Sequence, residues 1–464
     1  MSLRLYDTRT REVRPLAPLR EGQVGLYVCG PTPQALPHVG HLRGGVAMDV
    51  LHRWLVASGL QVTFVRNVTD VDDKIINDAA KKGEPWWALA TRMTRAFRAA
   101  YEAVQVLPPH AEPTVTGHLP QIVALIELLI ERGHAYASGG DVYLSVRSVP
   151  SYGEISHQSV DNLRQGEADD SLKREPIDFA LWKGAKPGEP SWPSPWGPGR
   201  PGWHIECSAM AVEYLGTSFD IHGGGRDLVF PHHENECAQS TAAGHGFASV
   251  WLHHGLVTAA GGEKMSKSLG NSVTVAEALE TVPRPVLRYA LGAAHYRSTI
   301  EWSDQVVADA AAAYERIATF VRNATEAVGD APVDESLAKV SWDEFAAAMD
   351  DDLGVPQALA VVHNGIRAGN ALLAEREIPA LAATLALVRR MLAVLCLDPI
   401  GDWPSQSGGQ LTSVVDALVD VVVEARAAAR ERKDYAQSDA IRDRLAAAGV
   451  VLEDTADGVR WRLS

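Results

Sequence analysis

Cysteine is scarce in this chain, which has only four thiols in 464 residues: Cys29, Cys207, Cys237 and Cys396. They are widely spaced, unlike the pattern of a small disulfide-stabilised protein, so we expect a reducing compartment and metal or core roles. Cys396 lies in LAVLCL and is most simply a core thiol. A net positive charge is also absent. The net charge of -15 argues against a surface that binds nucleic acid indiscriminately, although it allows a local basic stripe.

Long hydrophobic runs are missing as well. No stretch approaches the roughly 20 apolar residues of a membrane span. The N-terminus, MSLRLYDTRTREVRPL, alternates charged and apolar residues where a secretory signal needs a continuous apolar core. We therefore expect a cytoplasmic protein with no membrane partner. A monomer is the working expectation for its oligomeric state, and no internal repeat is evident.

The first third of the chain predicts a parallel sheet. Residues 24–29, VGLYVC, are typical of a buried strand, and residues 61–68, QVTFVRNV, of a second one. Apolar residues recur at helical spacing between them until Gly59 ends the helix. This β-α-β unit predicts a Rossmann-type α/β catalytic domain, which binds ligands at the carboxyl ends of its strands.

Further along, the pattern predicts three domains, because a chain this long exceeds one ordinary core. Helices are expected over 87–104 and 119–132, a strand from Asp141, an irregular loop over 184–202, and strands again at FDIHGGG and WLHHGLV. From about residue 304 to Leu397 the chain is Ala-rich and helical. Residues 402–410 have linker composition, and a helical pair with a short terminal strand follows. We expect a catalytic domain over 1–303 with an insertion at about 110–200, an α-helical bundle over 304–401, and a small C-terminal α+β segment over 411–464.

The motif PHVGH follows the first strand. Pro37 suits the first position of a helix, which places His38 and His41 on one face of its first turn. Free N–H groups there attract phosphate, Gly40 lets a flat base approach, and two imidazoles could stabilise charge at an α-phosphate. Solvated histidines at a helix end are the alternative, and this short motif alone does not decide between them.

A lysine-rich loop, residues 261–271, contains KMSKS after the Gly261–Gly262 pair. Lys264 and Lys267 are mobile charges suited to a leaving pyrophosphate, and the glycines would let the loop close. Two lysines alone would more often mark a charge-rich surface loop. Their occurrence together with PHVGH is far more specific.

Metal-ligating side chains occur in three separate stretches. Cys29 ends the first strand, Cys207 lies in GWHIECSAM, and PHHENECAQS begins at Pro231. On a helix that starts there, His232 and Glu236 are four residues apart, but so are His233 and Cys237, and spacing alone does not choose between the pairs. A four-ligand set of this kind suits zinc, and a purely structural zinc is the alternative to a functional one.

PHVGH and KMSKS together resemble the two signatures of class I aminoacyl-tRNA synthetases, with Val39 where isoleucine is usual. The segments around the cysteines resemble the cysteinyl branch of that family, and the resemblance runs from about Leu5 to Trp461. Cys237 departs from the family, which commonly has an apolar residue there. We interpret it as a spectator thiol.

The resemblance implies an enzyme that activates cysteine with ATP and Mg²⁺, releasing pyrophosphate, and then transfers cysteine from the adenylate to the 3′ end of its tRNA. It implies one Zn²⁺ per chain, held by Cys29, Cys207, His232 and Glu236. Catalytic roles fall on His38, His41, Lys264 and Lys267; ATP contacts on Gly40, Gly223, Gly224, Gly225 and both lysines; cysteine contacts on Gly30, Thr32, Thr69, Trp203 and His222.

Zinc is expected to select the substrate through its sulfur. Cysteine can ligate the ion as a thiolate, whereas the hydroxyl of serine is a harder donor that is difficult to deprotonate. Pocket size alone would discriminate the two by only about 1–3 kcal/mol. No editing domain is therefore expected.

The C-terminal residues 425–461 resemble the anticodon-binding segment of the same family. The expected tRNA contacts are Arg430, Arg432, Lys433, Arg442, Arg444 and Trp461, which could stack on a base. The acids mixed among these bases keep an ordinary solvated helix as the alternative. Two rival functions are a ligase that joins cysteine to the amine of an amino sugar, and a non-catalytic zinc-containing RNA-binding regulator.

Overall fold

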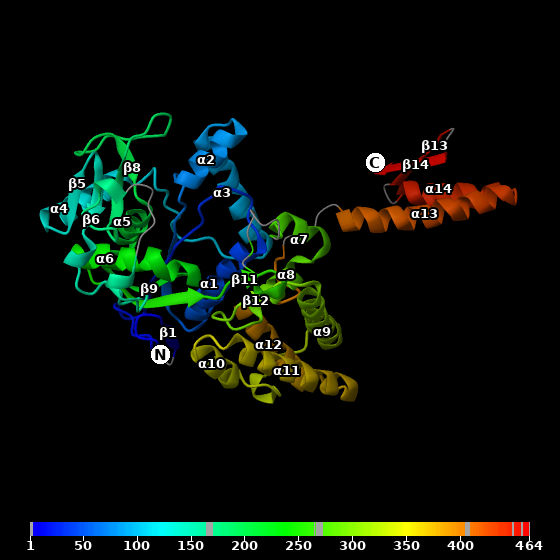
Figure 1. Cartoon of the computed structure of the whole chain (residues 1–464). Coiled ribbons are helices and arrows are strands. Elements are labelled where there is room, and N and C mark those ends of the chain that lie inside the picture. Colours follow the sequence, from blue (N-terminus) through cyan, green and yellow to red (C-terminus); the bar gives the residue numbers. More distant parts are fainter. Residues whose placement is uncertain are drawn as a thin grey trace. The chain divides into compact units, whose positions relative to one another are not determined.

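The computed structural model of the chain describes residues 3–163, 170–263, 265, 272–403, 409–447, 450–455 and 458–463. The chain forms two compact units, Met1–Trp403 and Pro404–Ser464 (Figure 1). The larger unit contains the central sheet, the candidate metal ligands and most of the described helices.

The larger unit is built around four parallel strands in the order β10-β9-β3-β4. Their bounds are β3 (Gln23–Val28), β4 (Gln61–Arg66), β9 (Ser218–Gly225) and β10 (Phe247–His254). Leu26 and Val28 of β3 join one apolar core and Tyr27 joins the other, because successive side chains of a strand point to opposite faces. The predicted β-α-β unit is confirmed, since α1 (Val39–Ala57) connects β3 to β4. A hairpin of β1 (Arg4–Asp7) and β2 (Glu12–Pro15) adjoins β10.

Helix α1 begins two residues later than its sequence predicts. His38 has extended backbone dihedrals, and its ring accepts the N–H of Gly40, so His38 caps the helix and Val39 is the first helical residue. The prediction that Pro37 occupies this position is therefore wrong. The predicted end is confirmed: Ser58 caps the helix, and Gly59 has a φ of 86°.

The insertion carries a second, antiparallel sheet in the order β5-β6-β7-β8. Its strands are β5 (Ala135–Ser138), β6 (Asp141–Leu144), β7 (Phe179–Gly184) and β8 (Gly199–Pro201). The helices before it are α2 (Asp73–Lys82), α3 (Trp86–Ala103) and α4 (Leu119–Glu131), and the helices predicted over 87–104 and 119–132 are thus confirmed to within a residue. The stretch predicted as an irregular loop, 184–202, is mostly irregular but ends in β8, which pairs with β7.

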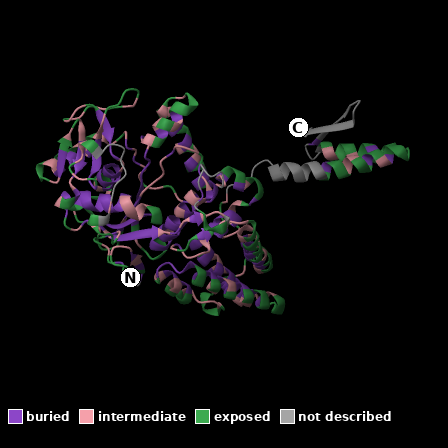
Figure 2. Cartoon of the chain, in the orientation of Figure 1, coloured by how far each residue is buried: buried purple, intermediate pink, exposed green. Residues whose placement is uncertain are grey.

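Two helices return the chain to the central sheet and carry metal-ligating side chains. Helix α5 (Trp203–Leu215) precedes β9, and α6 (Glu234–Ala242) precedes β10. A π-turn, Val229–His233, leads into α6 and replaces the regular helix expected from Pro231. Both helices pack in the apolar core that also contains the insertion; α6 is almost wholly buried, and α5 is buried over His204–Ala211 with its last turn reaching the surface (Figure 2).

From Asp304 the larger unit is helical, as predicted, with α9 (Asp304–Val328), α10 (Trp342–Asp350), α11 (Val355–Glu375) and α12 (Ile378–Leu395). Before it come α7 (Val275–Thr281) and α8 (Arg284–Gly292), while β11 (Val257–Thr258) and β12 (Ile300–Glu301) form a short parallel pair. Within the described residues, α12 is the one helix long and apolar enough to cross a membrane. However, 61% of it is buried inside the protein, as in the core helix of a bundle.

The smaller unit consists of α13 (Gly409–Glu431), α14 (Tyr435–Ala447), β13 (Val450–Thr455) and β14 (Gly458–Leu463). The predicted helical pair is confirmed. The single terminal strand expected after it is instead an antiparallel hairpin, in which Thr455 pairs with Gly458.

Candidate functional site

A cavity of about 1340 Å³ opens where β3 ends and α1 begins. Its lining includes Cys29 and Gly30 after β3, His38 and His41 at the start of α1, and Trp203 at the start of α5. The carboxyl ends of parallel strands meet at one edge of a sheet, so residues distant in sequence converge there. The cavity lies where the sheet topology predicts a ligand site.

Cys29, Cys207, His232 and Glu236 converge beside this cavity, each offering a ligand atom within 4.8 Å of the others. The Sγ atoms of Cys29 and Cys207 are 3.6 Å apart, and Cys29 Sγ lies 3.3 Å from Glu236 Oε1. His232 Nε2 is 3.1 Å from the same carboxylate oxygen. Cys29 is half-buried and the other three are buried.

This donor set fits a metal ion. Burial, with Cys207 and Glu236 beside it, raises the pKa of the Cys29 thiol well above its usual value. Two thiolates and a carboxylate in one buried cluster repel one another. A divalent cation bound among them would neutralise this negative charge and use the same groups as ligands. Two sulfurs, an imidazole and a carboxylate are donors that zinc accepts.

A second set overlaps the first. Cys29 and Glu236 also converge within 4.8 Å with His222 and His233. His222 Nε2 is 2.9 Å from Glu236 Oε2, and His233 Nδ1 is 2.7 Å from His253 Nε2. Cys237 belongs to neither set among the described residues, and burial raises its pKa to about 12, so its thiol is neutral. The pairing of His233 with Cys237 that the spacing left open is therefore not formed.

Four of the five residues expected to contact cysteine line the cavity: Gly30, Thr32, Thr69 and Trp203. The Trp203 ring stacks on His232, with centroids 4.4 Å apart. Gly30 is required by close packing, because an added Cβ would lie 1.6 Å from the carbonyl oxygen of Asn67. His222, the fifth, is fully buried beside the carboxylate of Glu236 and is not among the lining residues.

The rings of His38 and His41 lie against each other at the start of α1, with centroids 3.7 Å apart and planes tilted by 33°. His41 Nδ1 accepts the backbone N–H of His38, and His38 Nδ1 accepts that of Gly40, both at 3.1 Å. A neutral ring that accepts at Nδ1 carries its proton on Nε2. Burial, with His38 beside it, lowers the pKa of His41 to about 3, so His41 is a neutral N–H donor near pH 7.

Of the glycines expected to approach ATP, Gly40 and Gly225 line the cavity. Gly223 and Gly224 instead leave room for other side chains, since an added Cβ would lie 3.0 Å from Met48 Sδ or 2.6 Å from the His233 ring. Lys264 and Lys267 lie outside the described residues. The chain that follows them returns to α1, where Val39 N–H donates to the carbonyl of Val273 at 3.0 Å.

The sequence analysis missed a glycine pair inside α1. Gly44 and Gly45 line the cavity, and a Cβ on Gly44 would lie 2.5 Å from His254 Nε2, itself a lining residue. Each glycine costs a helix roughly 1 kcal/mol relative to alanine. A pair of them within a strongly helical pattern was the available signal.

The predicted tRNA contacts lie in the smaller unit. Arg430 is on α13, Arg432 and Lys433 form the turn after it, and Arg442 and Arg444 are on α14, all exposed. Arg442 is also close to Asp439 and Asp443, at 3.7 and 3.8 Å. Trp461 pairs with Leu452 across the hairpin, and its side chain lies outside the described residues. Tyr435, 61% exposed at the start of α14, is an aromatic residue that the sequence analysis did not single out.

Three family models match successive parts of the chain. Residues 15–312 match "tRNA synthetases class I (C) catalytic domain", residues 344–397 match "DALR domain", and residues 412–462 match "Cysteinyl-tRNA ligase anticodon binding domain".

Curated relatives extend the match to the whole chain. The "Cysteine--tRNA ligase" of Streptomyces coelicolor is 54% identical over 100% of this chain and 76% of its own length. That of Streptomyces griseus is 52% identical over 100% of this chain and 99% of its own.

Solved structures share the fold at low identity. Mycobacterium tuberculosis methionyl-tRNA synthetase in complex with methionyl-adenylate has a TM-score of 0.61 at 16% identity, covering 80% of this chain and 90% of that chain. The LeuRS–tRNA–LeuAMS ternary complex of Agrobacterium radiobacter has a TM-score of 0.58 at 11% identity, covering 84% and 88%.

Proposed function

This chain belongs to the cysteine–tRNA ligases, a family of class I aminoacyl-tRNA synthetases, and we propose that it selects cysteine through the substrate's sulfur atom. The overall reaction forms cysteinyl-adenylate and pyrophosphate from cysteine and ATP, and then transfers the cysteinyl group from the adenylate to the 3′ end of the tRNA for cysteine, releasing AMP. The observation that carries the proposal is the convergence of two thiols, an imidazole and a carboxylate beside the cavity.

Cys29, Cys207, His232 and Glu236 are the ligands we propose for one zinc ion. When bound there, zinc supplies a soft Lewis acid that stabilises a thiolate. Set against the overlapping cluster, this choice gives the ion two sulfurs instead of one. It also leaves His222 to orient the carboxylate of Glu236, as residues next to a metal site commonly orient its ligands, and leaves His233 to interact with His253.

Cysteine would lie in the inner part of the cavity, against Gly30, Thr32, Thr69 and Trp203. The stacking of Trp203 on His232 supports this, because it joins one wall of the substrate pocket to a proposed ligand. His222 would act through Glu236, since it lies behind the cluster. A hydroxyl substrate gains little from the thiolate-binding site, so serine is rejected without editing.

His38 and His41 would donate hydrogen bonds from their Nε2–H groups to the α-phosphate as charge develops on it. Neutral donors at a helix N-terminus need no reorganisation when the adenylate forms. Gly40 and Gly225 leave room for the nucleotide, and Gly223 and Gly224 leave room for the side chains of Met48 and His233. Lys264 and Lys267, with Mg²⁺, would balance the charge on the departing pyrophosphate.

The test of this proposal is cysteine-dependent ATP–pyrophosphate exchange, measured with cysteine and with serine before and after chelation. We expect exchange with cysteine to fall at least ten-fold on chelation and to return with added zinc, while exchange with serine stays at background throughout. Exchange with cysteine that survives complete removal of the metal would refute the proposal.

The tRNA is bound by the C-terminal anticodon-binding region, which matches the family model over residues 412–462. We propose contacts from Arg430, Arg432, Lys433, Arg442, Arg444 and Trp461, and a division into catalytic (1–303), bundle (304–401) and anticodon-binding (411–464) domains. We propose that the enzyme acts as a cytoplasmic monomer. Deleting the residues after Gly401 should abolish tRNA charging and spare exchange; charging that survives the deletion would refute the role of this segment in tRNA binding.

A further inference from the structure

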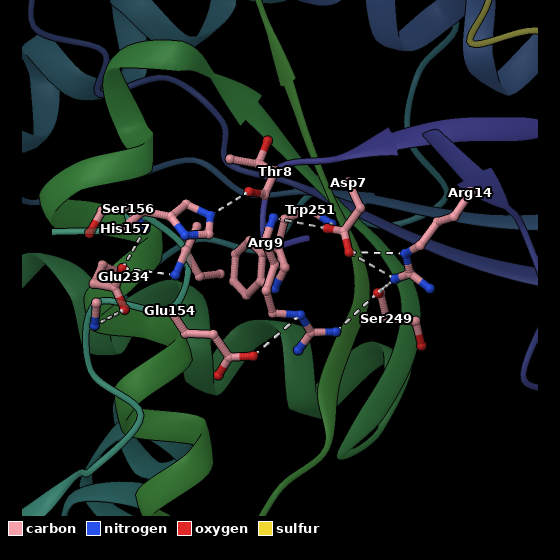
Figure 3. A network of polar contacts seen from close by, with 12 residues as sticks. Asp7, Thr8, Arg9, Arg14, Glu154, Ser156, His157, Glu234, Ser249 and Trp251 are labelled. Carbon is pink, nitrogen blue, oxygen red and sulfur yellow. Dashed lines mark hydrogen bonds and ion pairs between the residues drawn. The ribbon is translucent and has the colours of Figure 1, made fainter. Parts of the chain in front are cut away.

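Glu234 lies between the proposed ligands His232 and Glu236 in sequence, yet its carboxylate is bound by a loop of the insertion. The side chain is 1% exposed. It accepts the backbone N–H of Gly153 at 2.8 Å through Oε1, and those of Ile155 and Ser156 at 3.1 and 2.7 Å through Oε2 (Figure 3).

The loop, residues 152–157, is shaped to present these N–H groups. Gly153 has a φ of 98°, and a Cβ there would lie 2.4 Å from the carbonyl oxygen of Gln158, so only glycine fits without strain. Successive N–H groups in such a turn form a concave site for an anion. Tyr152 adds a fourth link, because its hydroxyl donates to Asn235 Oδ1 at 2.6 Å.

The ligand segment needs an external support of this kind. Its π-turn, Val229–His233, contains Phe230 with extended dihedrals, and the first turn of α6 has no side-chain cap at His233. A helix start normally gains order from a capping side chain. Residues two apart on a helix point to different sides, so the carboxylate of Glu234 can be held while its neighbours face the cluster.

The loop is itself anchored on the central sheet through the N-terminal hairpin (Figure 3). His157 Nε2 lies 3.2 Å from the carbonyl oxygen of Thr8. The preceding residue, Asp7, is fully buried and accepts the N–H of Trp251 on β10 at 3.0 Å. Hydrogen bonds therefore connect β10, the hairpin, the loop and the first turn of α6.

We propose that Glu234 is a positioning residue for the metal centre, which fixes His232 and Glu236 by holding the first turn of α6 against loop 152–157. The inference rests on the proposed function, because it takes those two residues as ligands. Metal–ligand distances tolerate only about 0.2 Å, so a loosened first turn weakens ion binding before it disturbs the fold. Losing an outer support typically weakens metal binding about 10- to 100-fold.

Glu234→Gln in the full chain is the sharpest perturbation. It keeps the size of the side chain but places an NH₂ group against backbone N–H groups. Glu154→Gln is the matched control, since Glu154 is on the same loop and its side chain is 44% exposed, 3.7 Å from Arg9. The measurements are zinc affinity by competition with a chromophoric chelator, the KM values for cysteine and ATP in exchange, and the melting temperature.

We expect Glu234→Gln to weaken zinc binding at least ten-fold and to raise the KM for cysteine, with the KM for ATP unchanged and activity rescued by excess zinc. Glu154→Gln should match the wild type. Wild-type zinc affinity in Glu234→Gln, or equal rises in both KM values, would overturn the inference. If Glu234→Gln does not fold, Tyr152→Phe should weaken zinc binding in the same direction, and an unchanged affinity there would overturn it. If the wild-type chain itself failed to bind zinc, that result would instead refute the proposed function.

Discussion

Replacing Cys207 with serine separates the two overlapping ligand sets, because Cys207 belongs to one of them and not to the other. The substitution keeps the volume of a side chain that is 1% exposed, so it changes the donor atom and little else. Cys237→Ser is a matched control: it makes the same change in a buried thiol next to Glu236, outside both sets.

The size of the effect follows from the ligand count. Structural zinc in proteins is bound with about 10–16 kcal/mol, so each of four ligands accounts for roughly 2.5–4 kcal/mol. At about 1.4 kcal/mol per ten-fold change, losing most of one ligand's share raises the zinc dissociation constant by about 10²- to 10³-fold. In Cys207→Ser, Cys29 would be the one sulfur ligand left in the set, and it cannot also take the place of Cys207.

The assay is zinc competition with a chelator, followed by pyrophosphate exchange with cysteine and with serine. Cys207→Ser should lose zinc and cysteine affinity together, while Cys237→Ser keeps both. If Cys207→Ser bound zinc as tightly as wild type and still rejected serine, the set containing His222 and His233 would hold the ion, and our assignment would be wrong.

Three further predictions concern residues that we propose to act on ATP or to line its binding site. The folded-state pKa of His41 is about 3, below the ordinary 6.5, so its contribution to stability is fully present above about pH 6.5 and is lost as the pH falls toward 3. In His41→Gln, the free energy of unfolding should fall less steeply over this pH range, by up to about 1.4 kcal/mol per pH unit. An unchanged pH dependence in denaturant titrations would contradict this. Lys267→Ala should slow adenylate formation about 10²-fold in single-turnover assays with little change in cysteine affinity, because the lysine charge stabilises pyrophosphate as it departs. A rise in the KM for cysteine alone would argue against that role. Gly44→Ala should raise the KM for ATP, since its Cβ would displace the ring of His254 in the cavity, while the overpacking cost of about 1–3 kcal/mol is partly offset by the roughly 1 kcal/mol that alanine adds to a helix; an unchanged KM for ATP would refute the packing argument.

Local patterns in the sequence were sufficient for the fold of residues 24–68, but they did not predict the hairpin of β1 and β2 that precedes them. Strand, helix and strand between Val24 and Val68 follow from side-chain period and from a stop at Gly59, which are properties of neighbouring residues. The contact between the rings of His38 and His41 follows in the same way from a three-residue spacing. The helix start was two residues off, because the ring of His38 caps the backbone and no propensity reports that contact.

The sequence by itself determined the family, the parallel sheet, the helical bundle and the residue types able to bind a soft metal ion. Tertiary structure alone decided which of them meet: Cys29 and Cys207 come within 3.6 Å across a gap of 178 residues, while Cys237, beside a proposed ligand, points elsewhere. It also decided that Gly224 makes room for His233 and that Glu234 is held by loop 152–157. The physical reason is that periodicity and spacing report only which side chains share a face of one element, whereas a ligand cluster depends on how the ends of several elements pack around one point.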